Sequence, residues 1–313
     1  MPPMRRFLPL LFTLSATPLS AQPVTIDNAF WKQWGDGQAE LSGYELRFPR
    51  YGEQRSGVAV AIFVTETFSE SARVKADPGK HPAADEVPVM KLNWVQDFQT
   101  GVYDYNLMSS AFIALAPRKS RPAGAPMKLS FSSQEWCGHV YHQLLFDDAA
   151  IRETLHSYFD GEADAANTLE YPAGGLSEDA LLLWARGFSE PVLAPGQSAT
   201  RPLLRGLEAS RLLHKPVAWQ TVKLERKKGN EQLKVPLGSF EAEVLTAAID
   251  GDRSWTFWVE KAAPRRILKI ARSDGFEASL LGGERMKYWE MNGNRYESAL
   301  AKLGLSRRAA RAP

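Results

Sequence analysis

The stretch Met90-Lys91-Leu92-Asn93-Trp94-Val95-Gln96-Asp97-Phe98 alternates apolar and polar residues over most of its length. A period of two is typical of a β-strand with one buried and one exposed face. The same alternation recurs in further segments: Tyr44 to Phe48, Tyr103 to Leu107, Met127 to Phe131, Trp255 to Val259 and Phe276 to Leu280. The almost wholly apolar run from Val58 to Val64 predicts a strand that is covered on both faces.

The connections between these segments favour antiparallel pairing. Gly251 and Gly275 each follow an aspartate between two such runs, which is a hairpin signal. The short spacing of the strands leaves little room for helical crossovers. We therefore expect a mainly β protein with a few short helices, built either as one antiparallel curved sheet or half-barrel, or as two packed β subdomains.

Three helices are expected. Ser177 is a candidate N-cap for a helix with Leu181 to Trp184 in its body, a second helix is predicted over Asp148 to Phe159, and a third over Tyr296 to Leu303. The loop from Pro191 to Pro202 is the best candidate for a subdomain boundary. The predicted division is a signal peptide at 1–21, then two β-rich parts at 22–195 and 196–313, which either fold separately or form one domain.

The first residues have the pattern of an export signal. Arg5 and Arg6 precede the apolar run from Phe7 to Leu14, and small or turn-prone residues lead to a cleavage point after Ala21. We therefore expect a periplasmic or secreted protein. A lipid-modified protein would require a cysteine at the cleavage point, and none lies near it. No later stretch is long and apolar enough to predict a membrane span.

The composition restricts the class of partner. The chain is 44% hydrophobic and 24% charged, as is ordinary for a globular protein, and its formal net charge is only +2. Such a charge implies no strong field for nucleic acid or for an anionic membrane. Cys137 is the single cysteine in the sequence, so no intramolecular disulfide is possible.

The segment Ser130 to His142 is where chemistry would be sought. On a continuous strand, Glu135, Cys137 and His139 would share a face. Three interpretations compete. The first is a metal site formed by Cys137, His139 and His142. The second is a Cys137 nucleophile activated by His139 and Glu135, although side chains about 7 Å apart on one strand are far for a hydrogen bond. The third, which we expect, is structural: Cys137 is buried, Trp136 points to the opposite side, and no metal or other cofactor is needed.

Aromatic and basic residues supply candidates for ligand binding. The nine tryptophans serve either as core or as the lining of a pocket for an acyl chain or glycan, and Trp94, Trp136, Trp255 and Trp258 are the candidates for such a pocket. Arg265 and Arg266, in a basic turn, are candidates for holding a phosphate or anionic headgroup. The sequence contains no Walker loop, GxGxxG, GxSxG or HExxH motif.

Three runs carry a resemblance to known proteins. Ser-Ser-Gln-Glu-Trp-Cys-Gly-His at 132–139, Ser-Tyr-Phe-Asp-Gly-Glu at 157–162 and Val-Glu-Lys-Ala-Ala-Pro-Arg-Arg-Ile at 259–267 resemble a family of uncharacterised exported bacterial proteins. The C-terminal part, with Gly238-Ser239-Phe240 ahead of a Trp-containing strand, is similar to periplasmic β-rich domains of unknown function. The resemblance implies an envelope location and an antiparallel β architecture, and it supplies no catalytic residue.

The function expected from these observations is a non-enzymatic binding or carrier protein of the cell envelope. It would hold a small amphipathic ligand against an aromatic-lined concave sheet face. One alternative is an envelope interaction or scaffold protein whose sheet edges or faces meet a protein partner. Another is a metal- or thiol-dependent activity centred on Glu135, Cys137 and His139.

Overall fold

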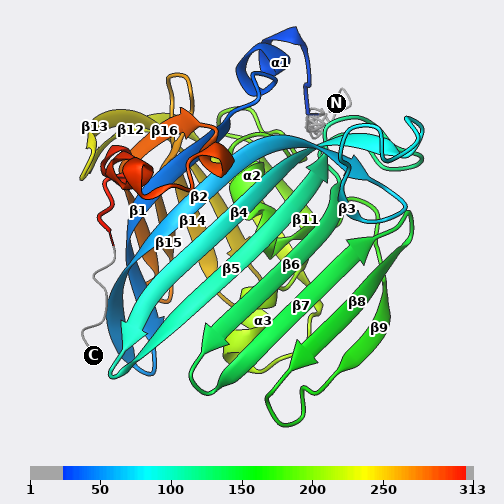
Figure 1. The fold of residues 1–313 in the computed structure, drawn as a ribbon, viewed down its shortest axis with the longest axis horizontal. Helices are drawn as coiled ribbons and strands as arrows, with labels where there is room; N and C mark the ends of the chain where they lie inside the picture. The colour runs from blue at the N-terminus through cyan, green and yellow to red at the C-terminus, as the bar shows by residue number, and fades with distance from the viewer. Residues whose placement is uncertain (1–23, 308–313) are drawn as a thin grey trace, which may run out of the picture.

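The computed structural model describes residues 24–307, which form one curved sheet of 16 strands (Figure 1). The predicted signal peptide at 1–21 lies outside the described residues. The strands are β1 (Ala39–Arg50), β2 (Glu53–Ser69), β3 (Val74–Lys75), β4 (Glu86–Thr100), β5 (Tyr103–Ala114), β6 (Pro126–Glu135), β7 (Gly138–Phe146), β8 (Ala150–Ser157), β9 (Ala165–Glu170), β10 (Leu176–Ser177), β11 (Ser198–Leu204), β12 (Trp219–Val235), β13 (Gly238–Ile249), β14 (Ser254–Glu260), β15 (Ile267–Arg272) and β16 (Glu277–Met286). The helices are α1 (Asn28–Trp34), α2 (Leu181–Ala185) and α3 (Leu207–Leu213), with 3-10 helices η1 (Glu178–Ala180), η2 (Tyr288–Glu290) and η3 (Asn294–Leu303).

The strands follow a nearly sequential path. From one edge the order is β10-β11-β12-β13-β14-β15-β16-β1-β2-β4-β5-β6-β7-β8-β9, and β3 pairs with β2. Neighbouring strands are antiparallel apart from the short parallel pair β10 and β11. β1 pairs with β16 from Ala39 opposite Met286 to Arg47 opposite Glu277, so strands on both sides of residue 195 share one sheet. The prediction of a mainly β protein with an antiparallel curved sheet and few short helices is confirmed.

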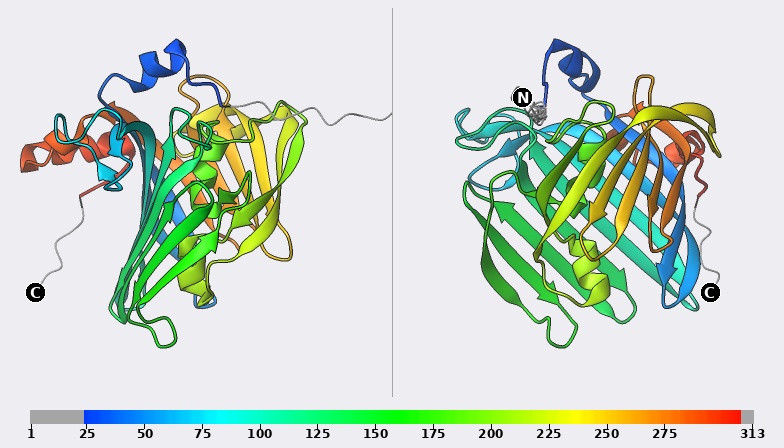
Figure 2. Two further views of the ribbon diagram at one scale, coloured as in Figure 1. Left: turned by 90° about the vertical axis from the view of Figure 1, so that its right-hand side faces the viewer. Right: turned by 180° about the vertical axis from the view of Figure 1, so that it is seen from behind.

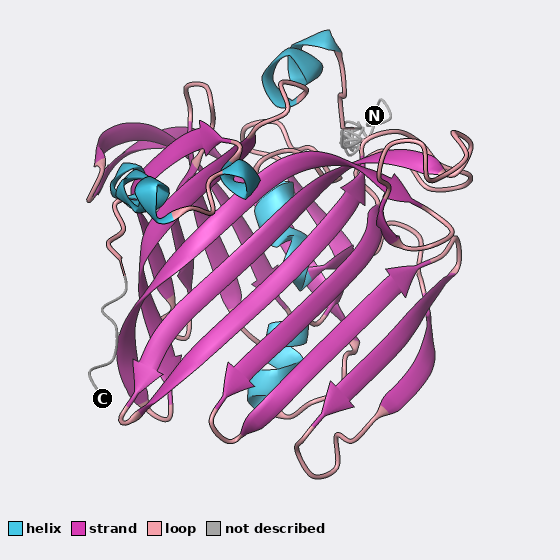
Figure 3. Ribbon diagram, in the orientation of Figure 1, coloured by secondary structure: helices cyan, strands magenta, loops and turns pink. Residues whose placement is uncertain are grey.

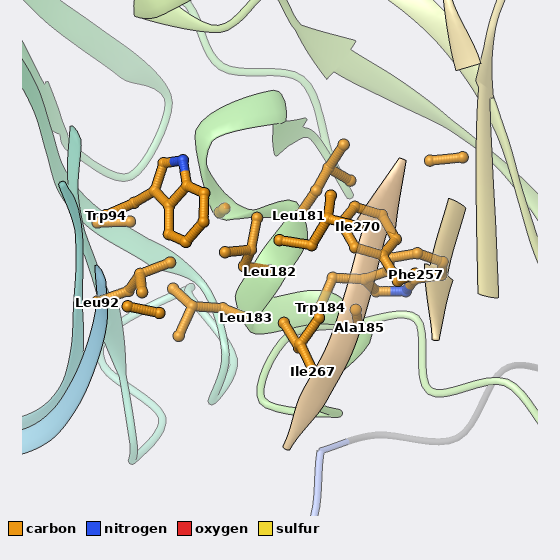
Figure 4. Close-up of a cluster of buried hydrophobic side chains, with 14 of the residues drawn as sticks. Leu92, Trp94, Leu181, Leu182, Leu183, Trp184, Ala185, Phe257, Ile267 and Ile270 are labelled. Carbon is orange, nitrogen blue, oxygen red and sulfur yellow. The ribbon is translucent and has the colours of Figure 1, made fainter. Parts of the chain in front are cut away.

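The sheet curves around its helices. Strands β1 to β9 form one wall, strands β11 to β16 form the other, and α2 and α3 lie between the walls (Figures 2 and 3). All five residues of α2 are buried. Figure 4 shows α2 between Leu92 and Trp94 on one side and Phe257, Ile267 and Ile270 on the other. A short helix that is apolar on every side is stable only inside a protein, so α2 completes the core between the two walls.

The alternating segments place their apolar residues in this core. Tyr44, Leu46 and Phe48 of β1 are fully buried, while Glu45 and Arg47 are exposed. Gly251 and Gly275 lie in turns with positive φ, as expected for hairpins. No helix among residues 24–307 has the length and apolar character needed to cross a membrane.

The run from Val58 to Val64 differs from its prediction. Ala59, Ala61 and Phe63 face the core, but Val58 is exposed, and Val60 and Ile62 are only partly buried. Val64, on the same outer face as Val58, is buried in a small cluster with Leu41 and Leu303. The expectation that both faces are covered is therefore wrong at Val58, where only the concave side of the sheet is filled, and confirmed at Val64.

Two of the three helix predictions are confirmed. The Ser177 hydroxyl accepts a hydrogen bond from the Asp179 N–H at 3.3 Å and starts η1, which continues into α2. The last predicted helix corresponds to the 3-10 helix η3. The helix predicted over Asp148 to Phe159 is wrong, because this segment forms β8, which pairs with both β7 and β9.

Candidate functional site

The segment Ser130 to His142 is a hairpin and not one continuous strand. β6 ends at Glu135, β7 begins at Gly138, and these two residues are paired. Trp136 and Cys137 form the connecting turn. A two-residue turn reverses the chain, so Glu135, Cys137 and His139 do not share one strand face, and that part of the prediction is wrong.

The three candidate residues have different environments. Glu135 is buried and forms an ion pair with Arg211 of α3. Cys137 is exposed, so its predicted burial is wrong: it lies at the tip of a hairpin. Trp136 is exposed at the same tip rather than placed on the opposite side of a strand.

The candidate metal ligands are likewise separated. His139 is exposed, while His142 is buried on β7. No group of three or more His, Cys, Asp or Glu side chains among residues 24–307 is arranged to hold a metal ion. His142 instead contributes to a pocket on the inner side of β7.

This pocket has a volume of about 310 Å³ and lies between the last strands of the sheet and α3. We call it the seam pocket, because it adjoins β9, one edge of the open sheet. Its wall on the sheet side consists of Val140, His142, Glu153, Leu155, Ala165 and Asn167, and the remainder of the lining comes from residues 161–163, 210, 211 and 214–216. A volume of about 300 Å³ is at the lower end of the range for small-molecule sites.

Three polar side chains on successive strands form a connected group in the seam pocket. His142 Nε2 lies 2.7 Å from Glu153 Oε1, and Asn167 Nδ2 donates to Glu153 Oε2 at 2.9 Å. The hydrogen bond from His142 is the main cause that lowers the pKa of Glu153, so this carboxylate is ionised although it is buried. The group holds the imidazole in one orientation at the pocket wall.

Arg211 forms the opposite wall from α3. Its guanidinium pairs with Glu135, lies 3.3 Å from His214 Nε2 through Nη1, and stacks 3.6 Å from the centre of the Phe159 ring. Arg211 Nε and the hydroxyl of the neighbouring Ser210 are buried and have no hydrogen-bond partner. The seam pocket therefore combines apolar surface with polar groups from two facing elements.

A second, smaller space lies deeper between the walls. This interior cavity has a volume of about 40 Å³ and is lined partly by Trp94, Trp255, Gln96 and Arg272. Such a volume holds about two or three water molecules. Trp94 and Trp255 do line a common space, as the aromatic-pocket interpretation proposed, but the space is too small for an acyl chain.

The interior cavity is bordered by three acidic side chains from two elements. Glu178 accepts hydrogen bonds from Arg253 Nε at 2.9 Å, Arg253 Nη2 at 2.7 Å, Trp255 Nε1 at 2.8 Å and the Gly206 N–H at 2.9 Å. Asp179 accepts from the Leu207 N–H at 3.0 Å. These two residues thereby hold the first turn of α3, the helix that carries Arg211.

The third acid, Glu208, lies in that first turn. It is 3.5 Å from Arg272 Nη1 and accepts a hydrogen bond from Gln96. Burial is the main cause that raises the pKa values of Glu208 and Asp179, and it raises the pKa of Asp179 to about 7. The charges of Glu178 and Glu208 raise the pKa of Asp179 further, since like charges disfavour its ionised form.

The remaining candidate ligand residues lie outside both spaces. Trp258 donates through Nε1 to Glu231 at 2.9 Å. Arg265 pairs with Glu243 at 2.7 Å, and Arg266 pairs with Glu260 through two hydrogen bonds. The basic turn is thus neutralised by carboxylates of the same protein.

Sequence reasoning missed Glu153, Asn167 and Arg211. The sequence does contain a pattern that indicates Glu153. Ile151, Glu153 and Leu155 occupy one face of a period-two pattern, which puts a carboxylate in an apolar row. Arg211 and Asn167 carry no comparable signal, because the carboxylates that they bind, Glu135 and Glu153, belong to other elements of the fold.

Comparison with known proteins adds a distant structural likeness. No family model matches the chain, and no curated protein matches it. A solved structure described as a β-barrel-like protein of the domain of unknown function DUF1849, from Brucella abortus, aligns with 12% identity and a TM-score of 0.42, covering 79% of this chain and 98% of that one. The resemblance drawn from the three sequence runs stays a prediction.

Proposed function

We propose that this protein is an exported, non-enzymatic binding protein of the cell envelope that holds a small amphipathic ligand in the seam pocket. The observation that carries the proposal is the pocket itself: about 310 Å³ of space whose lining combines apolar residues with polar and charged side chains that converge from the sheet and from α3. The buried His142–Glu153 pair and Arg211 would orient a polar head, while Val140, Leu155 and Ala165 would contact the apolar body.

The seam pocket replaces the concave face as the proposed site. α2 and α3 fill the space between the sheet walls, and the interior cavity leaves only about 40 Å³. An acyl chain could enter there only if the core opened, which would expose a large area of buried apolar surface. The seam pocket needs no such opening, because it is already accessible beside α3.

Export is tested by the mass of the protein. Because Arg5 to Ala21 have the order of a signal peptide, we expect protein from a Gram-negative envelope fraction to lack residues 1–21. Intact-mass spectrometry measures this directly. A soluble cytoplasmic pool that retains Met1 would contradict the proposed location.

Ligand binding is tested with a fluorescent amphipathic anion, 1-anilinonaphthalene-8-sulfonate, and a matched pair of substitutions on β9. Ala165 lines the seam pocket, and its neighbour Ala166 is exposed on the other face of the strand. We expect saturable binding by the wild-type protein. Ala165→Trp should raise the Kd at least ~10-fold, a loss of ~1.4 kcal/mol, because the indole occupies the pocket.

Ala166→Trp is the control and should leave the Kd within about twofold, since it adds the same ring outside the pocket. Equal weakening by both variants, or no saturable binding by the wild type, would refute the seam pocket as a site. Native mass spectrometry of protein purified without detergent would then identify any ligand that the protein carries from its host.

A further inference from the structure

The most exposed large hydrophobic side chains of the described chain lie in four hairpin turns. Tyr158 is 77% exposed, Val102 76%, Trp136 65% and Tyr51 57%. The other large hydrophobic residues in residues 24–307 are 47% exposed or less. Single apolar residues are commonly exposed on protein surfaces. Four highly exposed ones in successive turns of one sheet indicate a shared role.

The sheet topology places these turns at the same end of the molecule. Residues 51–52 join β1 to β2, 101–102 join β4 to β5, 136–137 join β6 to β7, and 158–164 join β8 to β9. Because adjacent strands are antiparallel, every second connection returns to one end, which is the lower edge of the front wall in Figure 1. We call this set the hairpin row.

Neighbouring turns of the hairpin row support one another. The rings of Trp136 and Tyr103 lie 6.3 Å apart, and the Tyr158 N–H donates to the His139 carbonyl at 3.2 Å. Tyr51 and Tyr105 share a hydrogen bond of 2.6 Å between their hydroxyls. With two strand spacings between successive turns, the row extends for about 30 Å. It is a fixed line of aromatic and aliphatic tips.

The hairpin row has no large excess of positive charge: the Arg50 guanidinium donates to the Tyr51 and Tyr105 hydroxyls, and the other charged groups include several carboxylates. Arg55 pairs with Glu53 at 2.8 Å, His156 with Asp164 at 3.0 Å, and His214 with Glu162 at 2.5 Å. Asp160 adds an exposed carboxylate. A row without excess positive charge matches an uncharged or zwitterionic surface rather than an anionic one.

The turns of the other wall at the same end are different in kind. Asp250, Gly251 and Asp252 connect β13 to β14, and Ser273, Asp274 and Gly275 connect β15 to β16; all of them are exposed. The side chain of Gln54 donates to the Gly275 carbonyl at 3.1 Å, which places these polar turns beside the hairpin row. The most exposed apolar tips therefore lie on one wall, and acidic turns lie on the other, where the connection 205–218 exposes Leu213 to 46%.

We infer that the hairpin row is a membrane-contact edge that inserts into the headgroup region of a zwitterionic lipid bilayer. Trp and Tyr are the residues that favour this region, because each has an apolar ring and a polar group. Separate turns on a rigid sheet can each bury one side chain while their backbone polar groups stay hydrated. The acidic turns of the other wall would remain in water and fix the tilt of the molecule.

The geometry fits a bilayer better than a protein partner. Strong protein contacts centre on a compact cluster of side chains that becomes fully dry, surrounded by a polar rim. The hairpin row is instead a line of single anchors about 10 Å apart, which suits a flat and deformable surface. The turns expose no continuous strand edge to which a peptide could add.

The seam pocket lies close to this edge. Gly161, Glu162 and Ala163 belong to the last turn of the hairpin row and also line the pocket. A ligand leaving the headgroup region would therefore meet the pocket without crossing bulk water. The membrane contact goes beyond the proposed function and does not depend on it. The two are tested separately, because the dye titration of the seam pocket is performed without lipid and the vesicle experiment without dye.

The test uses Cys137, the single cysteine, which is exposed in the hairpin row. A nitrobenzoxadiazole fluorophore attached to it reports the polarity of its surroundings. We expect its emission to rise when phosphatidylcholine vesicles are added, and the protein to sediment with the vesicles. The double variant Val102→Ser/Trp136→Ser should lower the vesicle partition coefficient at least ~10-fold, because two apolar anchors are lost.

The matched control is Val74→Ser/Trp289→Ser, which removes the same residue types from exposed positions outside the row, 47% and 46% exposed. It should keep the partition coefficient within twofold, and circular dichroism should show both variants folded. No vesicle binding by the wild type, or equal loss in both variants, would overturn the inference. A dimer in analytical ultracentrifugation that depends on Val102 and Trp136, without vesicle binding, would overturn it as well.

Discussion

Replacing Glu178 by glutamine is expected to lower the free energy of unfolding by ~3 kcal/mol, the lower end of the range for breaking a buried ion pair, because Arg253 keeps Asp252 as a second partner at 3.1 Å. Glu178 is buried and accepts four hydrogen bonds, two of them from the buried guanidinium of Arg253. A glutamine amide would remove the charge that Arg253 faces and would turn an N–H group toward its donors.

Urea unfolding followed by tryptophan fluorescence measures this loss. The control is Glu225→Gln, which breaks an ion pair with Lys223 that is 3.4 Å long and solvent-exposed. Such pairs contribute little, so the control should stay within about 0.5 kcal/mol of the wild type. A loss below about 1 kcal/mol for Glu178→Gln would show that Glu178 does not hold the two walls and α3 together.

The neighbouring substitution Asp179→Asn is expected to act in the opposite direction at high pH. The pKa of Asp179 is raised from 3.8 to about 7 in the folded protein, mainly by burial. Below about pH 4 the carboxyl is protonated in both folded and unfolded chains. As the pH rises from 4 to 7, the unfolded chain loses this proton first, so this group makes the folded state progressively less stable.

Asparagine resembles the protonated acid and carries no charge, so it removes this cost. The difference of about three pKa units sets an upper limit of ~4 kcal/mol for the gain at pH 8, and contact with the interior cavity reduces it. The stability of Asp179→Asn and wild type should be compared by urea unfolding at pH 4 and pH 8. A gain in stability that is the same at both pH values would show that Asp179 is already ionised in the folded protein at pH 4, and so that its pKa is not raised.

Opposite effects from adjacent carboxyls follow from their partners. Glu178 is matched by the guanidinium of Arg253, whereas Asp179 receives a backbone N–H and a hydroxyl and no cation. Both residues hold the start of α3, and α3 carries Arg211 into the seam pocket. Loosening Glu178 should therefore weaken the proposed ligand site as well as the fold.

Much of the fold could be predicted from local patterns. Tyr44, Leu46 and Phe48 alternate with charged residues, and a strand with that pattern can bury only one face. The Ser177 cap could be predicted because a capping side chain binds the nearest N–H groups of its own helix. These signals depend on interactions between residues a few positions apart.

The candidate site could be predicted only in part. His142 was a candidate, but its expected partners Cys137 and His139 lie in an exposed turn and on an outer face. The two-residue turn at Trp136 and Cys137 lacks the Asn-Gly or Asp-Gly pair that usually signals a hairpin. Glu153 was hidden because its segment, β8, was predicted as a helix.

The sequence by itself determined the period of the strands, the positions of most turns and the one-sided burial that makes this a mainly β protein. Tertiary structure decided which strands became neighbours, and so which polar residues met. The pairs Arg211 with Glu135 and Glu178 with Arg253 join residues more than seventy positions apart. Local propensity carries no information about such contacts, because they form only when the curved sheet brings the end of β6 to α3 and the turn before β14 to η1.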